Sequence, residues 1–146
     1  MANGKLERVA VAVDDIHAVS DDLAKVFGIE LSHMDVEEMG IKAAVGDDGI
    51  ELVQKIEAAP RCADHWRGPL AALCIGVDDL DAAEARMEEA GFALVQRVET
   101  HGGLRELFYG ANFHGLPLVV YERSERSLKD LTARPDDAEP LKVDWL

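Results

Sequence analysis

The chain has 146 residues, 48% of them hydrophobic and 30% charged, and its formal net charge at pH 7 is −14. This length and apolar content suffice for one compact domain with a buried core. Because so strong a negative charge repels phosphate, we expect neither a nucleic-acid partner nor an anionic membrane partner. The same charge is also explained by solubility alone.

Cys62 and Cys74 are the only cysteines, and their spacing fits neither a disulfide framework nor a zinc cluster. A reducing, cytoplasmic location is therefore expected. The N-terminus lacks an apolar signal core, and no stretch approaches the roughly 20 apolar residues of a membrane span. These features predict a soluble protein that is not exported.

An internal repeat organises the chain. The segment Val11-Ala-Val-Asp-Asp-Ile16 recurs 64 positions later as Ile75-Gly-Val-Asp-Asp-Leu80. Each copy opens with an apolar residue at every second position, which predicts a strand with one hydrophobic face. The residues of these faces are Val9, Val11 and Val13 in the first copy and Leu73, Ile75 and Val77 in the second.

A helix is expected after each of these strands. The paired aspartates of the repeat are candidate N-caps and place negative charge at the positive end of a helix. The two helices are expected over residues 15–27 and 79–90. Both patterns stop at a glycine, Gly28 and Gly91, which suits a left-handed C-terminal cap.

Three strand-like runs follow each helix. They span residues 30–36, 41–45 and 50–55 in the first half, and 92–98, 104–109 and 116–121 in the second. The order β-α-β-β-β therefore occurs twice. We expect a first module at 1–57, a linker at 58–69, a second module at 70–123 and a C-terminal tail at 124–146. The charged, proline-broken tail is expected to be mostly irregular, with its end either packed on the body or on a second subunit, or disordered.

Apart from one arginine, the strand faces opposite the helices carry small side chains. The residues of these faces are Arg8, Ala10 and Ala12 on the first strand and Ala72, Cys74 and Gly76 on its repeat. Small inward residues leave room for a ligand inside a half-open barrel, although they also let two modules approach closely. The predicted fold class is α+β, with tandem βαβββ modules forming a half-open mixed β-sheet cup.

The sequence resembles the vicinal oxygen chelate superfamily of glyoxalases, bleomycin-resistance proteins and dioxygenases, and within it the methylmalonyl-CoA epimerase type. The resemblance covers Leu6 to Arg123. It rests on the segments 9–16, Val26-Phe-Gly28, Gly49-Ile-Glu-Leu-Val53, 73–80 and 108–121. It implies a glyoxalase-like fold and a homodimer. Activity is not implied, because the superfamily includes epimerases, lyases, dioxygenases, thiol transferases and metal-free antibiotic-binding proteins.

The resemblance also implies where a divalent metal would be held. The four matching positions here are Arg8, Glu51, Ala72 and Val119. A guanidinium cannot coordinate a cation, and Ala and Val offer no donor atom, so only Glu51 remains as a possible ligand. One carboxylate is too few for a divalent site, and we expect no metal and no other cofactor.

Arg8 and Glu51 are the candidate catalytic residues, because the resemblance places both side chains in the cup. Arg8 would stabilise an enolate-like or carboxylate oxygen, and Glu51 would move a proton. The alternative is a buried structural ion pair without chemistry. The two alternatives differ in one respect: a Glu51 clamped by Arg8 is held ionised and is a poor base, whereas a desolvated Glu51 free of Arg8 is a better one.

Five further residues are candidates for contact with a small-molecule ligand. They are Tyr121 and Cys74 on the inward strand faces, Arg105 and Tyr109 on the seventh strand, whose inward face the pattern leaves open, and His65 in the linker. The alternatives are ordinary packing for Tyr121, a buried inert thiol for Cys74, and for His65 a place in the crossover between the modules and not in a lid over the cup.

Two functions are compatible with these residues. One is a metal-independent isomerase, epimerase or lyase acting beside a carbonyl or carboxylate group. The other is a protein that binds and sequesters a small cationic or aromatic molecule, as in the bleomycin-resistance branch. The net charge favours the second, and an Arg8–Glu51 pair facing the cup favours the first.

Overall fold

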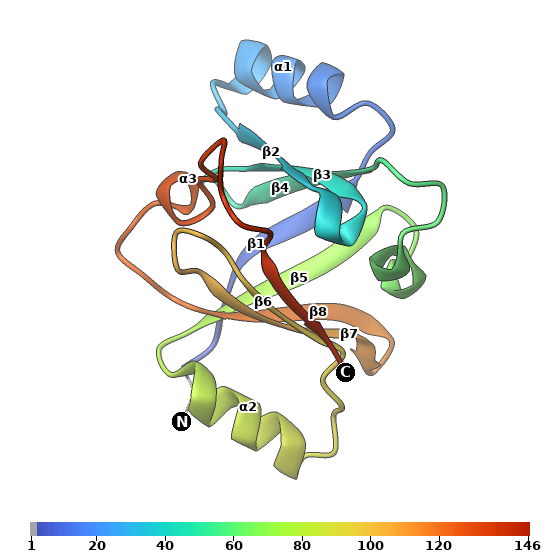
Figure 1. Cartoon of the computed structure of the whole chain (residues 1–146), viewed down its shortest axis with the longest axis vertical. Helices are drawn as coiled ribbons and strands as arrows, with labels where there is room; N and C mark the ends of the chain where they lie inside the picture. The colour runs from blue at the N-terminus through green and yellow to red at the C-terminus, as the bar shows by residue number, and fades with distance from the viewer. Residues whose placement is uncertain (1–2) are drawn as a thin grey trace.

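The repeat folds into two strand-helix units that share one curled sheet, as the computed structural model of residues 3–146 shows (Figure 1). The strands are β1 (Lys5–Ala12), β2 (Ser32–Val36), β3 (Ile41–Val45), β4 (Ile50–Lys55), β5 (Leu70–Val77), β6 (Gln96–Glu99), β7 (Arg105–Phe113), β8 (Leu116–Glu122) and β9 (Lys142–Trp145). The helices are α1 (Ile16–Phe27), α2 (Leu80–Glu89) and α3 (Leu128–Leu131), with 3-10 turns η1 (Glu37–Met39) and η2 (Arg61–His65).

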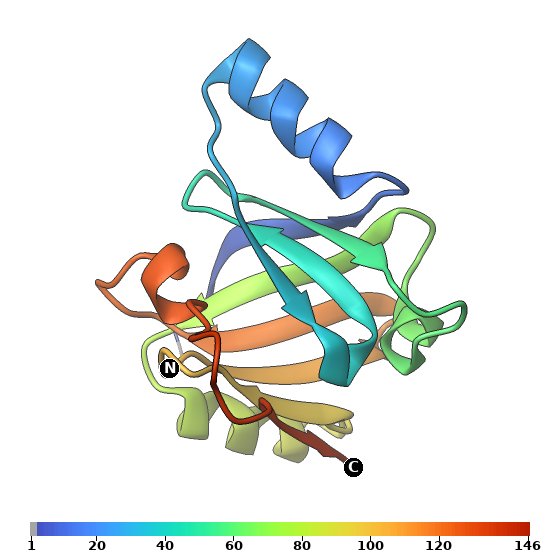
Figure 2. The same ribbon diagram turned by 45° about the horizontal axis from the view of Figure 1, so that its top comes forward.

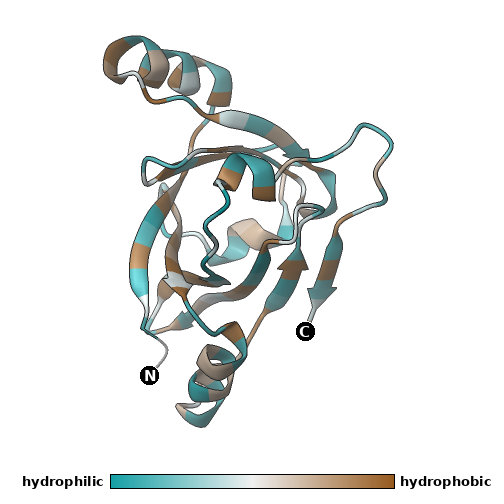
Figure 3. Cartoon of the chain, turned by 90° about the vertical axis from the view of Figure 1, so that its left-hand side faces the viewer, coloured by the Kyte–Doolittle hydropathy of each residue, from teal (hydrophilic) through white to brown (hydrophobic). Residues whose placement is uncertain are grey.

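The sheet has an internal symmetry that follows from the repeat. Its strand order is β2-β3-β4-β1-β5-β8-β7-β6-β9. Strands β5, β8, β7 and β6 of the second half mirror β1, β4, β3 and β2 of the first half, counted outward from the centre of the sheet. The first strand of each half pairs in parallel with the last strand of that half, and β1 and β5 pair antiparallel at the centre. The sheet curls into a half-barrel, which is visible from the side in Figure 3. The predicted α+β glyoxalase-like fold is confirmed.

Both long helices begin at the predicted aspartate caps. The side chain of Asp15 accepts a hydrogen bond from the Ala18 amide, and that of Asp79 accepts one from the Ala82 amide, each at 3.0 Å. The helices therefore start one residue later than expected, since an N-cap is not itself helical. Helix α1 ends at Gly28, whose φ of 69° is the left-handed conformation that glycine adopts without strain.

The helices cover the outer side of the sheet, α1 over the first half and α2 over the second (Figure 2). Under α2, Leu107 and Tyr109 of β7 pack with Leu80 and Ala83 of the helix. Because neighbouring residues of a strand point to opposite faces, this contact turns the alternate residue Glu106 to the inner face. The orientation of β7, which the sequence left open, is thereby fixed.

The tail differs from the expected irregular segment. It contains α3 and then β9, which pairs antiparallel with β6 and extends the sheet by one strand. Figure 2 shows the tail passing from α3 to β9 across the mouth of the curled sheet. Strand β6 is also shorter than the expected run 92–98, because residues 92–95 connect α2 to the sheet without forming a strand. Within residues 3–146 no helix is long and apolar enough to cross a membrane.

Tyr109 offers a test of this packing. Its side chain is 1% exposed, its hydroxyl has no hydrogen-bond partner within residues 3–146, and burial raises its pKa to about 12. An unpaired buried hydroxyl is destabilising, so Tyr109→Phe should raise the free energy of unfolding by about 1 kcal/mol in urea denaturation. A loss of stability would show that the hydroxyl makes a favourable interaction.

Candidate functional site

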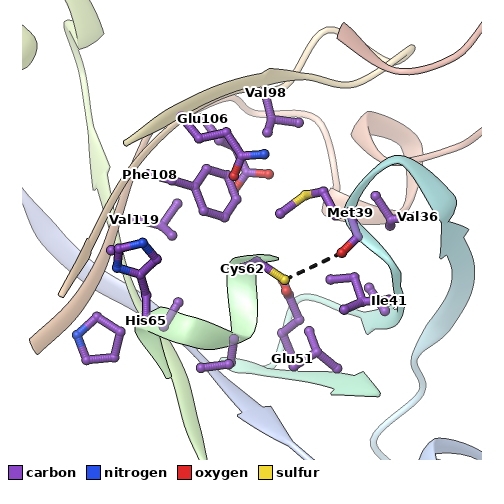
Figure 4. A pocket seen from close by; sticks show the side chains of 18 of the residues that line it. Val36, Met39, Ile41, Glu51, Cys62, His65, Val98, Glu106, Phe108 and Val119 are labelled. Atoms are coloured by element: carbon purple, nitrogen blue, oxygen red, sulfur yellow. Dashed lines mark hydrogen bonds between the residues drawn. The ribbon is translucent and has the colours of Figure 1, made fainter. Parts of the chain in front are cut away.

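A cavity of about 110 Å³ lies inside the curled sheet. At about 30 Å³ per water molecule, this volume corresponds to about four waters, and it is somewhat smaller than the ~150 Å³ cavity that holds benzene. The inner face of the sheet forms one side. The opposite side, which we call the roof, consists of Cys62, His65 and Trp66, from η2 and the residue after it, and of Leu141 from the tail. Trp145 of β9 lines the cavity at the edge of the sheet, where it pairs with Gln96. The lining is largely apolar (Figure 4).

The roof contacts strand β9 at the edge of the sheet. The guanidinium of Arg61 lies 4.1 Å from the centre of the Trp145 ring, a cation–π contact that joins η2 to β9. The linker therefore meets the tail, which was expected to be mostly irregular, at the cavity wall. Both tryptophans of the chain, Trp66 and Trp145, lie in its wall.

Arg8 is the centre of the polar part of the cavity. Its Nε donates to Glu51 Oε1 and its Nη2 donates to Glu106 Oε2, each at 2.9 Å. Its guanidinium carbon lies 4.7 Å from the centre of the Tyr121 ring. The two carboxylates enter the cavity from β4 and β7, one in each half of the repeat (Figure 4).

One nitrogen of this guanidinium is left over. Arg8 is 4% exposed, and its Nη1 is buried without a hydrogen-bond partner within residues 3–146. Each carboxylate contacts Arg8 through one oxygen, and the other oxygen has no hydrogen bond to another described residue. The site therefore combines a free cationic donor with two incompletely used acceptors.

Burial sets the charges of this group. Desolvation would lower the pKa of Arg8, but the charges of Glu51 and Glu106 outweigh it and raise that pKa well above its ordinary value. For Glu106, desolvation is the largest effect and raises the pKa of the carboxyl, and Arg8 opposes it only in part. Arg8 is therefore always charged, while Glu106 takes up a proton more readily than an exposed glutamate.

Gln96 supplies a second unused donor. It is 1% exposed, lines the cavity, and its Nε2 has no hydrogen-bond partner within residues 3–146. Across the sheet it lies in one transverse row with Phe108, Val119, Cys74 and Arg8, which are paired strand by strand. Arg8 lies at one end of this row, and Trp145 of β9, which pairs with Gln96, continues it at the other.

The height of the roof above β7 depends on Gly110. This glycine has a φ of 53°, and a Cβ placed on it would lie 2.3 Å from Nδ1 of His65. The same His65 nitrogen accepts a hydrogen bond of 3.1 Å from the Ala111 amide. The missing side chain therefore lets η2 approach the sheet closely enough for this bond.

Three of the residues expected at the site line the cavity: Arg8, Glu51 and His65. Tyr121 and Cys74 lie on the same inner face but outside the cavity lining, packed together with Ala10. The Tyr121 hydroxyl donates to Glu7, away from the cavity. Burial raises the pKa of the Cys74 thiol, which keeps it protonated and unreactive.

The two seventh-strand candidates lie elsewhere. Arg105 is at the surface, where it pairs with Asp81 at 2.9 Å and with Glu122 at 3.5 Å. Tyr109 lies under α2 on the outer side of the sheet. The structure thus does not bring these two residues to the cavity, and in their place β7 contributes Glu106 and Phe108.

The residues present do not fit a divalent metal. The four positions that correspond to metal ligands, Arg8, Glu51, Ala72 and Val119, do converge on the cavity wall. Their donor set, however, consists of one carboxylate that is already bound to a guanidinium. Within residues 3–146, no three His, Cys, Asp or Glu side chains form a group that could hold a metal ion.

Solved structures with the same fold include methylmalonyl-CoA epimerases. A Streptomyces coelicolor epimerase variant in complex with 2-nitronate-propionyl-CoA is 17% identical, with a TM-score of 0.68 over 82% of this chain and 97% of that one. The Mycobacterium tuberculosis epimerase is 23% identical, with a TM-score of 0.68 over 82% and 87%. A hypothetical protein from Bacillus halodurans is 20% identical, with a TM-score of 0.67 over 85% and 97%. These similarities establish the fold.

No protein with a curated description matches the sequence. The family model described as Glyoxalase/Bleomycin resistance protein/Dioxygenase superfamily matches residues 7–109, which include Arg8, Glu51, Gln96 and Glu106. With this match over most of its length, the chain belongs to the glyoxalase/bleomycin resistance protein/dioxygenase superfamily.

Proposed function

We propose that this protein is an enzyme that moves a proton on a small, largely apolar molecule beside a carbonyl or carboxylate group, as an isomerase, epimerase or lyase that uses no metal. The observation that carries the proposal is the buried guanidinium of Arg8, which lies between two carboxylates in a largely apolar cavity. One of its nitrogens has no hydrogen-bond partner among the described residues 3–146.

The chemistry follows from this arrangement. When Arg8 Nη1 donates a hydrogen bond to a carbonyl oxygen of the substrate, the C–H bond on the carbon next to that carbonyl becomes more acidic. A carboxylate then takes that proton, and the electron pair of the C–H bond moves toward the oxygen, where Arg8 stabilises the negative charge. Return of a proton to the same or an adjacent carbon completes an epimerisation or isomerisation. All these groups are side chains of this chain.

Glu106 is the stronger acid/base candidate, although the sequence suggested Glu51. Each carboxylate accepts one hydrogen bond of 2.9 Å from Arg8, so this contact alone does not distinguish them. Burial moves the pKa of Glu106 upward, toward the range in which a carboxyl both takes and gives a proton near neutral pH. Glu51 then serves chiefly to hold Arg8, and remains the second candidate.

The fold supports this class of reaction without specifying it. The solved neighbours named above include epimerases, but their identity of 17–23% carries no substrate over to this chain. A homodimer and a cytoplasmic location likewise stay predictions from the resemblance and the cysteine content.

Hydrogen–deuterium exchange in D₂O tests the proton transfer. We would follow by proton NMR a panel of ketones and carboxylates whose apolar bodies are about the size of a benzene ring or smaller. The wild type should exchange the hydrogen next to the carbonyl of at least one compound, and Glu106→Gln should slow that exchange at least about 100-fold. Glu99→Gln, a change at an exposed residue of the neighbouring strand β6, is the matched control and should retain the wild-type rate.

A binding protein is the second candidate, favoured by the largely apolar cavity wall and by the use of both carboxylates as partners of Arg8. The same panel separates the two functions. Compounds that bind the wild type and the Glu106→Gln variant equally, with no deuterium uptake in either case, would contradict the enzyme and support sequestration.

The pH dependence of stability separates an acid/base group from a permanently ionised partner. Folding raises the pKa of Glu106, so the protonated carboxyl favours the folded state. This stabilisation is fully present below the pKa of a glutamate in the unfolded chain, about 4.3. It is lost as pH rises through the higher pKa of the folded state. Glu106→Gln imitates the protonated form at every pH. The wild type should therefore lose stability relative to this variant as pH rises above about 4.3, measured by thermal unfolding from pH 4 to 8. The opposite slope would identify a structural ion pair.

A further inference from the structure

Tyr121 contacts Arg8 from outside the cavity. The Cζ atom of Arg8 lies over the face of the Tyr121 ring, 4.7 Å from its centre, although Tyr121 does not line the cavity. We infer that Tyr121 is a positioning residue, which holds the Arg8 guanidinium in the orientation that presents Nη1 to the substrate. Tyr121 has this role only within the proposed function, on which the inference rests.

The two carboxylates alone leave the guanidinium one motion. Glu51 and Glu106 hold it at two points, Nε and Nη2. A rotation about the line through these contacts remains, restricted only by the flexible side chain, and it swings Nη1. The Tyr121 ring supplies a third contact, of the cation–π type, which opposes this rotation. Since Tyr121 of β8 pairs with Glu106 of β7, neighbouring strands present the ring and the carboxylate together.

The ring of Tyr121 is itself held at its far end. Its hydroxyl donates to Glu7, and Arg123 contacts the same carboxylate at 3.4 Å. Asp78 binds Arg123 in turn, at 2.8 Å. Burial, and then the hydrogen bond to Glu7, raise the pKa of the Tyr121 hydroxyl, so it stays protonated and continues to donate. The ring is therefore fixed by its strand at one end and by its hydroxyl at the other.

An irregularity in β1 allows Glu7 to make this contact. Leu6 and Arg8 pair with two adjacent residues of β5, so Glu7 is an extra residue in β1. In a regular strand the neighbour of the inward-facing Arg8 would point outward. A bulge re-aims side chains, and here it lets Glu7 reach the hydroxyl of Tyr121 on the inner face.

Gly76 of β5 provides the space for the same contact. A Cβ placed on Gly76 would lie 2.8 Å from Oε1 of Glu7 and 2.8 Å from Cγ of Arg123. Any side chain there would displace the carboxylate that accepts from Tyr121. A bulge in one strand and an absent side chain in the next thus both serve to hold the ring that contacts Arg8.

The pKa of Glu106 reveals where the guanidinium lies. Arg8 lowers this pKa against the larger effect of burial, so a guanidinium that moves off Glu106 lets it rise. Tyr121→Leu, which removes the ring, should raise the pKa of Glu106 by about 1, measured from carboxyl ¹³C signals in a pH titration. Tyr109→Leu is the matched control, because it removes the other tyrosine of the chain from the outer side of the sheet. It should leave the pKa of Glu106 unchanged.

Tyr121→Phe keeps the ring and removes only its hydrogen bond to Glu7. The pKa of Glu106 should therefore rise in this variant too, but by less than in Tyr121→Leu. The milder variant keeps the measurement decisive even where Tyr121→Leu does not fold. A pKa of Glu106 that stays unchanged or falls in the Tyr121 variants, or that rises as much in Tyr109→Leu, would overturn the positioning role.

Deuterium exchange shows whether this orientation matters for the reaction. On a compound that the wild type exchanges, Tyr121→Leu should slow the exchange at least about tenfold. In an Arg8→Lys background, which keeps the positive charge but lacks the guanidinium fork, the same change should slow it less than about twofold. Equal slowing in both backgrounds would show that Tyr121 acts without Arg8 and would overturn the inference. A wild type that exchanges no compound contradicts the proposed function, whereas the titration of Glu106 decides separately whether Tyr121 holds Arg8.

Discussion

The buried guanidinium of Arg8 is the interaction on which the site and the joining of the two halves depend. A charge taken out of water is costly unless it is paired, and Arg8 is paired on both sides, by Glu51 from the first half of the repeat and Glu106 from the second. Removing one partner of such a group typically costs about 3–5 kcal/mol, because the remaining charge stays buried. The ion cluster therefore links the two copies of the repeat through their interior, in addition to the backbone pairing of β1 with β5.

The same cluster explains how this chain differs from a metal-binding arrangement on the same fold. The positions that would hold a divalent ion converge on the cavity wall, so the backbone of the site is present. The positive charge, however, belongs to the Arg8 side chain, and the two carboxylates beside it are its ion-pair partners. A covalently attached cation is always present and supplies directed hydrogen-bond donors, whereas a metal would supply open coordination positions. The chemistry available is then hydrogen bonding and proton transfer.

The sequence predicted the fold more fully than the site. The repeat, the alternating strands and the aspartate caps are local signals, and each corresponds to an element close to its expected bounds. Glu106 was missed as a site residue because β7 mixes polar and apolar residues, and the sequence does not show which alternate residues face the cavity. That orientation is determined by packing against α2. Gln96 was missed for a similar reason: its burial depends on β9, a strand from the tail that pairs with β6 across about 45 residues of chain. Long-range contacts of this kind leave no periodic pattern in the sequence.

Gly110 has a wider meaning for the shape of the cavity. A single absent methyl group sets the separation between η2 and β7, and the hydrogen bond from the Ala111 amide to His65 records that separation. The depth of the cavity at this point thus depends on a residue that has no side chain with which to contact a ligand. A Cβ there would overlap the ring of His65, so the packing of the linker on β7 and the space inside the cavity are both determined at this one position.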